Sequence, residues 1–444
     1  MERSQKNGLM VYALSLGCSK NLVDFERLLG PIYDDLGFSP TSEIEEADLI
    51  LINTCAFIQS AVKESLDKIF LTLSRRKPTA KLAVTGCLPS RDRAALVSDI
   101  PEIDLVVAPE DYPNLPSQVA LLFGLREPNV QATFNDWPRP RLGTPYYVAY
   151  LKISEGCDRK CAFCLIPKLK GRLKNRPFEE LLAETRALVE KGAVELTLVA
   201  QDLSSYRDGP LDLGDLAATL AGVKGLRWIR LMYNYPQTLT EKLVKKLANI
   251  PKVVPYLDVP LQHVSASVLK RMGRPRKDSL KFVQRLREWW PGVTLRTTLM
   301  VGFPGETVED FAALLKFVEA AKIDHLGVFE FEAEDGTLAA TMPDQVPKAV
   351  RKKRRAQVLS LQKKISLAKN KARLGQVYDV LVERPAEDSP LIMTGRAIFQ
   401  AVDVDGIVFF DGLQPKSGQI VKAKAVKAKE YDLAVRLIAD DNGR

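Results

Sequence analysis

The stretch that decides the fold of this chain reads Lys152-Ile153-Ser154-Glu155-Gly156-Cys157-Asp158-Arg159-Lys160-Cys161-Ala162-Phe163-Cys164. It follows the alternating apolar run 146–153, which predicts a strand, and it carries three cysteines with the spacing C-x3-C-x2-C. Three thiolates on one loop predict a metal site. A structural zinc site needs a fourth Cys or His nearby, whereas the two histidines of the chain, His263 and His325, are remote. A 4Fe-4S cluster accepts three cysteines and keeps one iron open for chemistry, so we favour a cluster over a zinc site completed from elsewhere.

The strand, the cysteine spacing and the aromatic Phe163 before the last cysteine resemble the signature of radical S-adenosylmethionine (SAM) enzymes. The resemblance implies that the open iron binds the amino and carboxylate groups of SAM, and that the cluster passes an electron that splits the C–S bond of SAM. Cys157, Cys161 and Cys164 are then the expected ligands of the cluster, and Phe163 is an expected SAM contact.

Bulk composition predicts an ordinary soluble protein of two or three domains: 444 residues, 46% hydrophobic and 27% charged. The apolar runs are strand-length and the N-terminus is polar, so we expect a cytoplasmic protein without a membrane partner. The net charge of +9 is uneven, because 348–373 contains eleven Lys/Arg and no acid, whereas 374–440 contains eight basic and ten acidic residues. The excess is therefore one basic helix, which weakens any inference from net charge to nucleic acid.

The first section, 8–124, repeats strand-then-helix four times and predicts a doubly wound α/β domain. Cys18, Cys55 and Cys87 each stand just past the end of a different predicted strand. Since the carboxyl ends of parallel strands meet at one edge of a sheet, we expect these three cysteines to hold a second 4Fe-4S cluster. The alternative is three buried structural cysteines. The predicted strands are 9–16, 47–52, 81–85 and 103–107, and the predicted helices are 22–29, 60–73, one from about 91, and 115–123.

After a Pro-rich linker at 125–144, the section 145–373 alternates strands and helices again and ends in the basic helix 348–373. Six strands with helical crossovers predict a partial, TIM-like (β/α)6 barrel, open on one side for a large substrate. Short alternating runs separated by turns between 374 and 441 predict a small all-β barrel. The runs are 377–382, 397–399, 406–410 and 419–423, and the six strands are 146–153, 195–200, 227–232, 253–259, 295–301 and 325–331.

Polar residues at the carboxyl ends of the six strands are candidate SAM contacts, with loop-stabilising hydrogen bonds as the alternative. A turn rich in glycine and proline after the fifth strand lets backbone approach a ligand closely. His263 is better interpreted as a supporting residue than as a proton donor. The candidates are Gln201, Asp202, Asp258, Gln262, His263, Arg296, Thr298 and the turn Gly302-Phe303-Pro304-Gly305.

The three sections together resemble the methylthiotransferases, which combine an N-terminal three-cysteine domain, a radical SAM core and a C-terminal TRAM barrel. The resemblance covers nearly the whole chain. Four strings are similar to the RimO-like branch, which acts on a ribosomal protein, rather than to the MiaB-like branch, which acts on tRNA adenosine. They are Leu16-Gly17-Cys18-Ser19-Lys20-Asn21-Leu22-Val23-Asp24, Asn53-Thr54-Cys55-Ala56-Phe57-Ile58, Tyr256-Leu257-Asp258-Val259-Pro260-Leu261-Gln262-His263, and Arg296-Thr297-Thr298-Leu299-Met300-Val301-Gly302-Phe303-Pro304-Gly305-Glu306-Thr307.

The resemblance implies two 4Fe-4S clusters, SAM used in two ways, and an aspartate of the twelfth small-subunit ribosomal protein as substrate. One SAM methylates sulfur at the N-terminal cluster, and another yields the radical that takes hydrogen from the aspartate β-carbon, so that 3-methylthioaspartate forms. A sulfur donor and an electron donor are also required, and the sequence identifies neither. It also leaves open whether the free ribosomal protein or the assembled subunit is the substrate.

Two alternatives stay open from the residues. A tRNA methylthiotransferase is the closer one because TRAM domains often bind RNA, although the mildly acidic barrel section suits a basic ribosomal protein better. The basic helix could contact RNA, but we expect it to brace the barrel. The second alternative is a non-catalytic RNA-binding factor that carries a metal.

Overall fold

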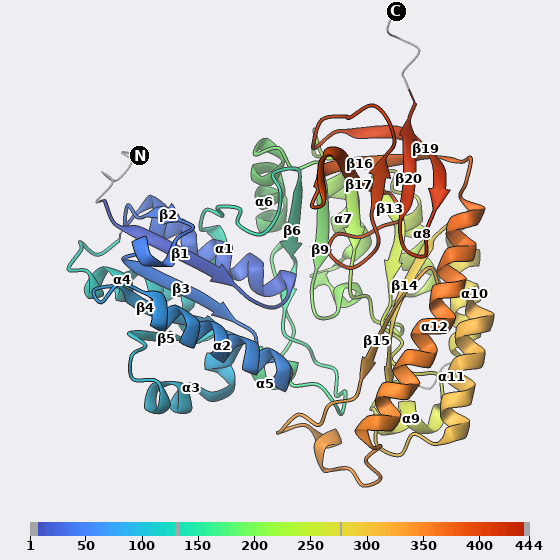
Figure 1. Ribbon diagram of the computed structural model, residues 1–444, viewed down its shortest axis with the longest axis horizontal. Coiled ribbons are helices and arrows are strands. Elements are labelled where there is room, and N and C mark those ends of the chain that lie inside the picture. The colour runs from blue at the N-terminus through green and yellow to red at the C-terminus, as the bar shows by residue number, and fades with distance from the viewer. Residues whose placement is uncertain (1–7, 129–132, 276–277, 439–444) are drawn as a thin grey trace, which may run out of the picture.

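The computed structural model describes residues 8–128, 133–275 and 278–438. Its N-terminal part is a parallel sheet in the order β2-β1-β3-β4-β5, covered by helices on both faces (Figure 1, blue to cyan). All six residues of β3 are buried, as expected for the central strand of a sheet with two covered faces. The strands are β1 Met10–Ser15, β2 Ser39–Thr41, β3 Leu49–Thr54, β4 Lys81–Gly86 and β5 Leu105–Val107; the helices are α1 Ser19–Asp34, α2 Gln59–Arg75, α3 Cys87–Asp99 and α4 Leu115–Leu122.

The central part is a six-stranded parallel sheet in the order β15-β14-β13-β12-β9-β6, which curls into a partial barrel with helices outside. The open side, next to β6, faces the N-terminal domain (Figure 1). The strands are β6 Val148–Lys152, β9 Glu195–Val199, β12 Trp228–Leu231, β13 Val253–Asp258, β14 Thr294–Val301 and β15 His325–Glu330. The helices are α5 Ile166–Leu169, α6 Phe178–Glu190, α7 Leu213–Ala221, α8 Glu241–Ala248, α9 Ala266–Arg271, α10 Ser279–Trp289 and α11 Val308–Ala321.

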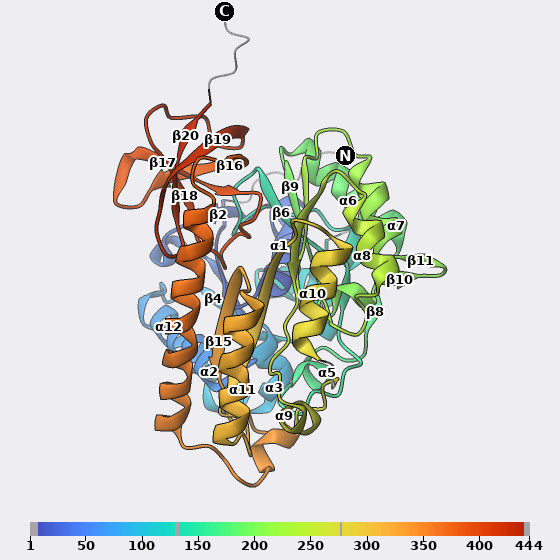
Figure 2. The same ribbon diagram turned by 90° about the vertical axis from the view of Figure 1, so that its right-hand side faces the viewer.

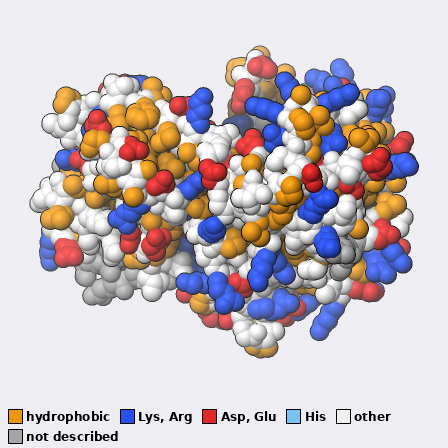
Figure 3. Space-filling model, turned by 90° about the horizontal axis from the view of Figure 1, so that it is seen from below, with side chains coloured by type: hydrophobic (Ala, Val, Ile, Leu, Met, Phe, Trp, Pro, Cys, Tyr) orange, Lys and Arg blue, Asp and Glu red, His pale blue; other side chains and the backbone are white. Residues whose placement is uncertain are grey.

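A long helix, α12 Lys348–Ala372, runs along the outside of the core and leads into the C-terminal barrel (Figure 2). Seen from below, Lys and Arg side chains concentrate on the core side of the molecule and are fewer over the N-terminal domain (Figure 3). The closed C-terminal barrel has the order β16-β17-β18-β20-β19. Its strands are β16 Val377–Ala386, β17 Ser389–Ala397, β18 Val408–Phe410, β19 Ile420–Ala428 and β20 Leu433–Leu437.

The fold class predicted from the sequence is confirmed in all three parts, whereas several elements differ. The prediction of a barrel strand at 397–399 was wrong, because β17 already ends at Ala397. The first half of β17 is mostly exposed, so its sequence does not show the alternation of apolar and polar residues that predicts a strand. The helix expected from about 91 begins at Cys87 and has a kink at Asp92. The sequence analysis missed β2, β20, α7, α8, the pairs β7 Ser154–Glu155/β8 Lys174–Asn175 and β10 Arg207–Asp208/β11 Leu211–Asp212, and short 3-10 turns at 44–46, 109–114, 134–136, 203–205 and 338–341. The domain boundaries 8–124, 125–144, 145–373 and 374–441 stay a prediction.

The inner face of the partial barrel is filled by its neighbours rather than by its own helices. Val23 of α1 and Leu381 and Ala401 of the C-terminal barrel join one apolar cluster with Tyr150 and Tyr256, which belong to core strands. The C-terminal barrel is thus docked against the core, and α1 closes part of its open side. None of the helices in the described residues is long and apolar enough to cross a bilayer.

Candidate active site between two cysteine triads

All six cysteines line one cavity of about 680 Å³. Three come from the carboxyl-terminal edge of the N-terminal sheet and three from the loop after β6 of the core, so the cavity lies between the two domains. None of the six forms a disulfide. The expectation that Cys18, Cys55 and Cys87 come together is therefore met in the geometry, and the structure adds that the second triad faces the first.

The core cysteine loop is fixed by close backbone contacts on two sides. Gly156 has φ +75°, and a Cβ there would lie 2.2 Å from the carbonyl oxygen of Arg172, so only glycine fits. On the other side, the Ala162 N–H donates to the carbonyl of Met272 at 3.0 Å. Phe163 packs edge-on against Phe303, with ring centroids 6.4 Å apart. The loop thus presents its three sulfurs in a set arrangement.

The N-terminal cysteine loops are tied together by two asparagine side chains. Asn21 Nδ2 donates to the carbonyl of Thr54 at 3.0 Å, and Asn53 Nδ2 donates to the carbonyl of Asn21 at 3.0 Å. Ser65 Oγ accepts from the Cys55 N–H at 3.1 Å and donates to the Cys55 carbonyl at 2.8 Å. These polar contacts fix the loops that carry Cys18 and Cys55. Our sequence analysis did not single them out.

Burial keeps two of the thiols protonated in the absence of a metal, and the core triad has hydrogen-bond donors that suit bound thiolates. Burial raises the pKa of Cys87 and of Cys164 to about 12, so each stays a thiol at neutral pH unless a metal replaces its proton. In the core triad each sulfur already has a donor: the Arg159 N–H lies 3.4 Å from Cys157 Sγ, the Ile166 N–H 3.4 Å from Cys164 Sγ, and Arg274 Nη1 3.8 Å from Cys161 Sγ. Such donors stabilise thiolates and tune the potential of an iron–sulfur cluster. Within the described part of the chain, no three Cys, His, Asp or Glu side chains are arranged to hold a single metal ion.

Positive side chains surround the cavity. Lys20, Arg159, Lys170 and Arg274 line it, and none of the described lining residues is Asp or Glu. Burial acts to lower the pKa of Lys20, but electrostatic interactions with its neighbours, with Tyr233 first and the carboxylates of Glu155 and Asp258 among them, raise its pKa above the usual value. The charged side chains that line the cavity are therefore all positive, which suits anionic groups in it.

Strained backbone is found at the same place. Tyr233 and Gln262 both have left-handed backbone, at φ 63° and 68°, and both line the cavity. The Tyr233 N–H is held by Asp258 Oδ2 at 3.0 Å, and the Gln262 N–H by the Thr298 carbonyl at 2.8 Å. Such strain costs about 1–3 kcal/mol per residue and persists only where surrounding contacts enforce it, typically at functional sites.

The predicted SAM contacts divide into two groups. Phe163, Gln201 and Gln262 line the cavity with the cysteines. Asp258 and Arg296 are paired with each other at 3.0 Å behind its wall, where Asp258 supports Tyr233.

Four other candidates also lie behind the cavity wall. Asp202 pairs with Arg159 at 2.9 Å, and Thr298 supports Gln262 through its carbonyl. Gly302 lies against Arg351, where a Cβ would approach the Arg351 side chain to 2.1 Å. His263 is fully buried and accepts from the Ser265 N–H through Nδ1 at 3.0 Å, as expected of a supporting residue.

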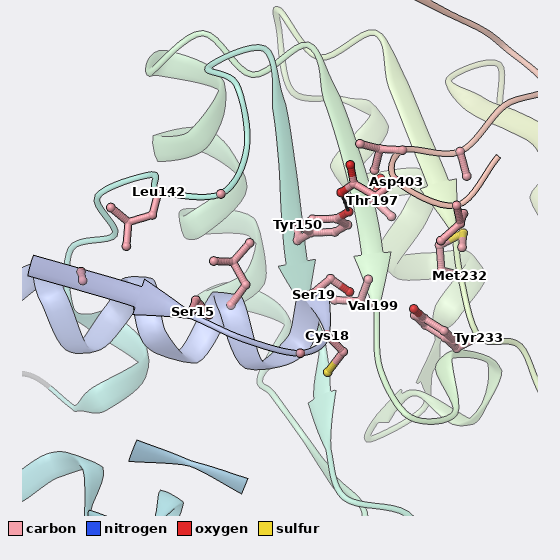
Figure 4. Close-up of a pocket in the computed structure, with 17 residues that line it drawn as sticks. Ser15, Cys18, Ser19, Leu142, Tyr150, Thr197, Val199, Met232, Tyr233 and Asp403 are labelled. Carbon is pink, nitrogen blue, oxygen red and sulfur yellow. Dashed lines mark hydrogen bonds between the residues drawn. The ribbon is translucent and has the colours of Figure 1, made fainter. Parts of the chain in front are cut away.

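A second cavity of about 550 Å³ adjoins the first and shares Gly17, Cys18 and Tyr233 with it. Figure 4 shows Cys18 and Tyr233 at one end, with Tyr150 and Asp403 at the other. Its wall combines the N-terminal domain, the linker, the inner face of the core and the loop 401–404 of the C-terminal barrel. The cavity thus gives a path from the junction of all three domains to the sulfur of Cys18.

Comparison with family models divides the chain into the same three parts. The radical SAM superfamily matches residues 151–318, the uncharacterized protein family UPF0004 matches 10–108, and the TRAM domain matches 374–438. The first two matches include the core and the N-terminal cysteine triad respectively.

Curated relatives match over nearly the full length. Ribosomal protein uS12 methylthiotransferase RimO of Geobacter sulfurreducens is 42% identical, with 97% of this chain and 98% of the relative covered. The protein of the same name from Geotalea uraniireducens is 42% identical, with 96% and 98% covered. Among solved structures, the radical SAM methyltransferase TsrM of Kitasatospora setae, with cobalamin and a 4Fe-4S cluster bound, has a TM-score of 0.54 at 16% identity and covers 72% of this chain and 74% of that chain. At that identity the likeness shows the fold alone.

Proposed function

The chain belongs to the ribosomal protein uS12 methylthiotransferase (RimO) family, and we propose that it adds a methylthio group to the β-carbon of an aspartate in uS12, the twelfth small-subunit ribosomal protein. The product is 3-methylthioaspartate. The observation that carries this proposal is the single cavity onto which both cysteine triads open. A reaction that joins a radical to a sulfur group needs both centres to reach one carbon, and this geometry provides for that.

Two 4Fe-4S clusters and SAM are the cofactors. Cys157, Cys161 and Cys164 would hold the first cluster, and Cys18, Cys55 and Cys87 would hold the second. When bound, the first cluster would supply the electron that cleaves SAM, and the second would supply the sulfur that is transferred. Phe163, Gln201 and Gln262 would contact SAM from the cavity wall, and Asp258, Arg296 and Gly302 would shape that wall from behind.

The protein's own residues position and shield these groups. Arg274 donates to Cys161 Sγ and stacks on Tyr235, with its guanidinium carbon 4.4 Å from the ring centroid. Arg159 stacks on the same ring at 4.2 Å. This stack forms a wall beside the core triad that excludes water, and exclusion of water protects a radical from side reactions.

The second cavity gives the substrate access to the site. The second cavity admits the loop of uS12 that carries the aspartate, between the N-terminal domain and the C-terminal barrel. We place the protein in the cytoplasm with the ribosomal protein, free or in its subunit, as partner. A sulfur donor and an electron donor complete the set, and neither RNA nor a membrane is required.

Product mass tests the proposal against the tRNA alternative. The anaerobically reconstituted enzyme is given SAM, a reductant and sulfide together with uS12 or tRNA. We expect uS12 to gain the mass of one methylthio group on an aspartate and tRNA to stay unchanged. A methylthio group on tRNA adenosine would assign the chain to the other branch.

Iron content tests the alternative of a non-catalytic metal protein. Two 4Fe-4S clusters predict about eight irons per chain in oxygen-free material. Zinc in place of iron, or iron for only one cluster, would contradict the proposed cofactors.

A further inference from the structure

Lys20 is one of the four cations that line the cavity, and the two preceding sections give it no task. It lies in the first turn of α1, two positions after Cys18, and its ammonium nitrogen is 3.7 Å from the centroid of the Tyr233 ring. Tyr233 lines both cavities, and Lys20 lines the one with the cysteines. The ammonium is therefore placed beside the N-terminal triad, where the path from the second cavity arrives.

The other three cations of the cavity already have partners. Arg159 pairs with Asp202 at 2.9 Å. Lys170 lies 3.8 Å from Asp24 and 3.9 Å from Glu155. Arg274 donates to Cys161 Sγ and to the Pro260 carbonyl. Among the described residues, no carboxylate lies within ion-pair distance of the Lys20 ammonium, whose recorded close contact is the face of Tyr233.

The Lys20 ammonium has room for an anionic partner. The side chain is half-buried at the cavity wall, and the face of one aromatic ring compensates its charge only in part, so an anion that enters the cavity would complete an ion pair with it. The backbone of Tyr233 adopts a left-handed conformation (φ 63°), and its N–H donates to the buried Asp258. The ring and the ammonium thus form one side of a site that is open towards the cavity.

We propose that Lys20 binds the side-chain carboxylate of the substrate aspartate and so places its β-carbon between the two cysteine triads. The inference rests on the proposed function, since an aspartate of a basic protein loop brings one carboxylate into the cavity. That carboxylate is bonded directly to the β-carbon. Binding the carboxylate therefore limits the positions that the reacting carbon can take. A glutamate would present a different carbon at this point, and an asparagine would leave the ammonium without its counter-charge. Lys20 is a residue that determines specificity for aspartate.

The test compares the wild-type holoenzyme with Lys20→Met, which keeps the length of the side chain and removes its charge, and with Lys20→Arg, which keeps a charge. Each is given uS12 or uS12 with the target Asp→Asn. We expect wild type to prefer Asp over Asn by at least about tenfold in kcat/KM, the range expected for a hydrogen bond to a charged group. Lys20→Met should lose that preference mainly through a higher KM for uS12, and Lys20→Arg should restore most of it. Lys63→Met, at an exposed position on α2, is the matched control and should behave as wild type.

Each other outcome has a distinct meaning. If Lys20→Met keeps both the preference for Asp and the wild-type KM for uS12, the proposal is overturned. If it instead raises the KM for SAM and leaves the preference for Asp unchanged, Lys20 binds the carboxylate of SAM and the proposal is overturned as well. Iron content shows whether each variant kept its clusters. If Lys20→Met lost them, the comparison of Lys20→Arg with wild type on the Asp and Asn substrates decides the question. A loss of the preference for Asp in Lys20→Arg with intact clusters would count against carboxylate binding. If the wild-type enzyme modifies tRNA but not uS12, the proposed function has failed, and the inference falls with it.

Discussion

Single residues decide whether two sulfurs can approach one another. Gly17, directly before Cys18, has φ +94°, and a Cβ there would lie 2.9 Å from Cys55 Cβ and 3.1 Å from Cys55 Sγ. Any larger side chain would push the Cys55 loop away from Cys18. The arrangement of the N-terminal triad therefore requires a residue without a Cβ at position 17, which explains the glycine there.

The proposed function gives the two triads different tasks, and substitutions of single cysteines test this. If Cys161 is a ligand of the cluster that cleaves SAM, Cys161→Ala should stop formation of 5′-deoxyadenosine and of methylthiolated uS12 together. If Cys55 is a ligand of the cluster that supplies sulfur, Cys55→Ala should let cleavage continue while methylthio transfer stops. Chromatography for deoxyadenosine and mass spectrometry of uS12 measure both. Full methylthiolation by the Cys55 variant would remove the second cluster from the reaction.

Among the elements, α12 shows how a strongly basic helix can be structural. Its buried residues recur every fourth position, which puts them on one face of the helix against the core. Gln362 Nε2 donates to the Ile323 carbonyl at 3.0 Å, and Arg354 pairs with the buried Glu306 at 3.2 Å. The exposed face keeps the rest of its positive charge. The helix thus packs against the core, and the expectation that it braces the barrel stays a prediction. The buried residues are Arg354, Val358, Gln362, Ser366 and Asn370.

The two faces of α12 should respond differently to the loss of a charge. Arg354→Ala leaves the carboxylate of Glu306 buried without its cation and should lower the free energy of unfolding of the core by about 3–5 kcal/mol. Lys352→Ala, on the exposed face of the same helix, should change it by no more than about 0.5 kcal/mol. Anaerobic urea unfolding of the iron-loaded variants, followed by far-ultraviolet circular dichroism, measures this difference. Equal midpoints for the two variants would show that the helix does not brace the core.

For the whole molecule, ion clusters join the N-terminal domain to the core. Glu184 of α6 accepts hydrogen bonds from Arg27 of α1, Arg139 of the linker and Arg176 of the core. Although burial opposes the charge of Glu184, the three guanidinium groups, with Arg27 first, hold its pKa well below the usual range. Lys152 of the core also donates to Asp24 of α1. The N-terminal domain is thus locked onto the open side of the barrel.

Loosening this lock should uncouple the two half-reactions. Glu184→Gln removes the carboxylate that three guanidinium groups share. Arg139 keeps Glu26 at 2.6 Å and Arg176 keeps Glu180 at 3.7 Å, but Arg27 loses its carboxylate partner, so we expect the N-terminal domain to dock less tightly. The ratio of methylthiolated uS12 to 5′-deoxyadenosine should fall by at least about tenfold, a change that about 1.4 kcal/mol of docking energy produces. Glu190→Gln, at an exposed position of the same helix, is the control. A wild-type ratio in Glu184→Gln would mean that the apolar contacts alone set the distance between the triads.

Much of this architecture follows from chain order and short-range pattern. Parallel strands expose their carboxyl ends at one edge, so the places of Cys18, Cys55 and Cys87 after three predicted strands were enough to predict that they meet. The spacing of Cys157, Cys161 and Cys164 similarly placed the other triad. Lys20 could have been found in the same way, because it stands two positions from Cys18.

The pairing of surfaces was decided by the tertiary structure alone. Three contacts depend on how the folded domains dock. Lys20 lies over Tyr233, Arg396 of the C-terminal barrel pairs with the buried Glu195 of β9, and α1 closes the open side of the core. Periodicity reports which face of an element is buried, but it carries no information on which remote surface covers that face. Local pattern therefore determined where the six sulfurs lie within their domains, and docking determined that they share one cavity.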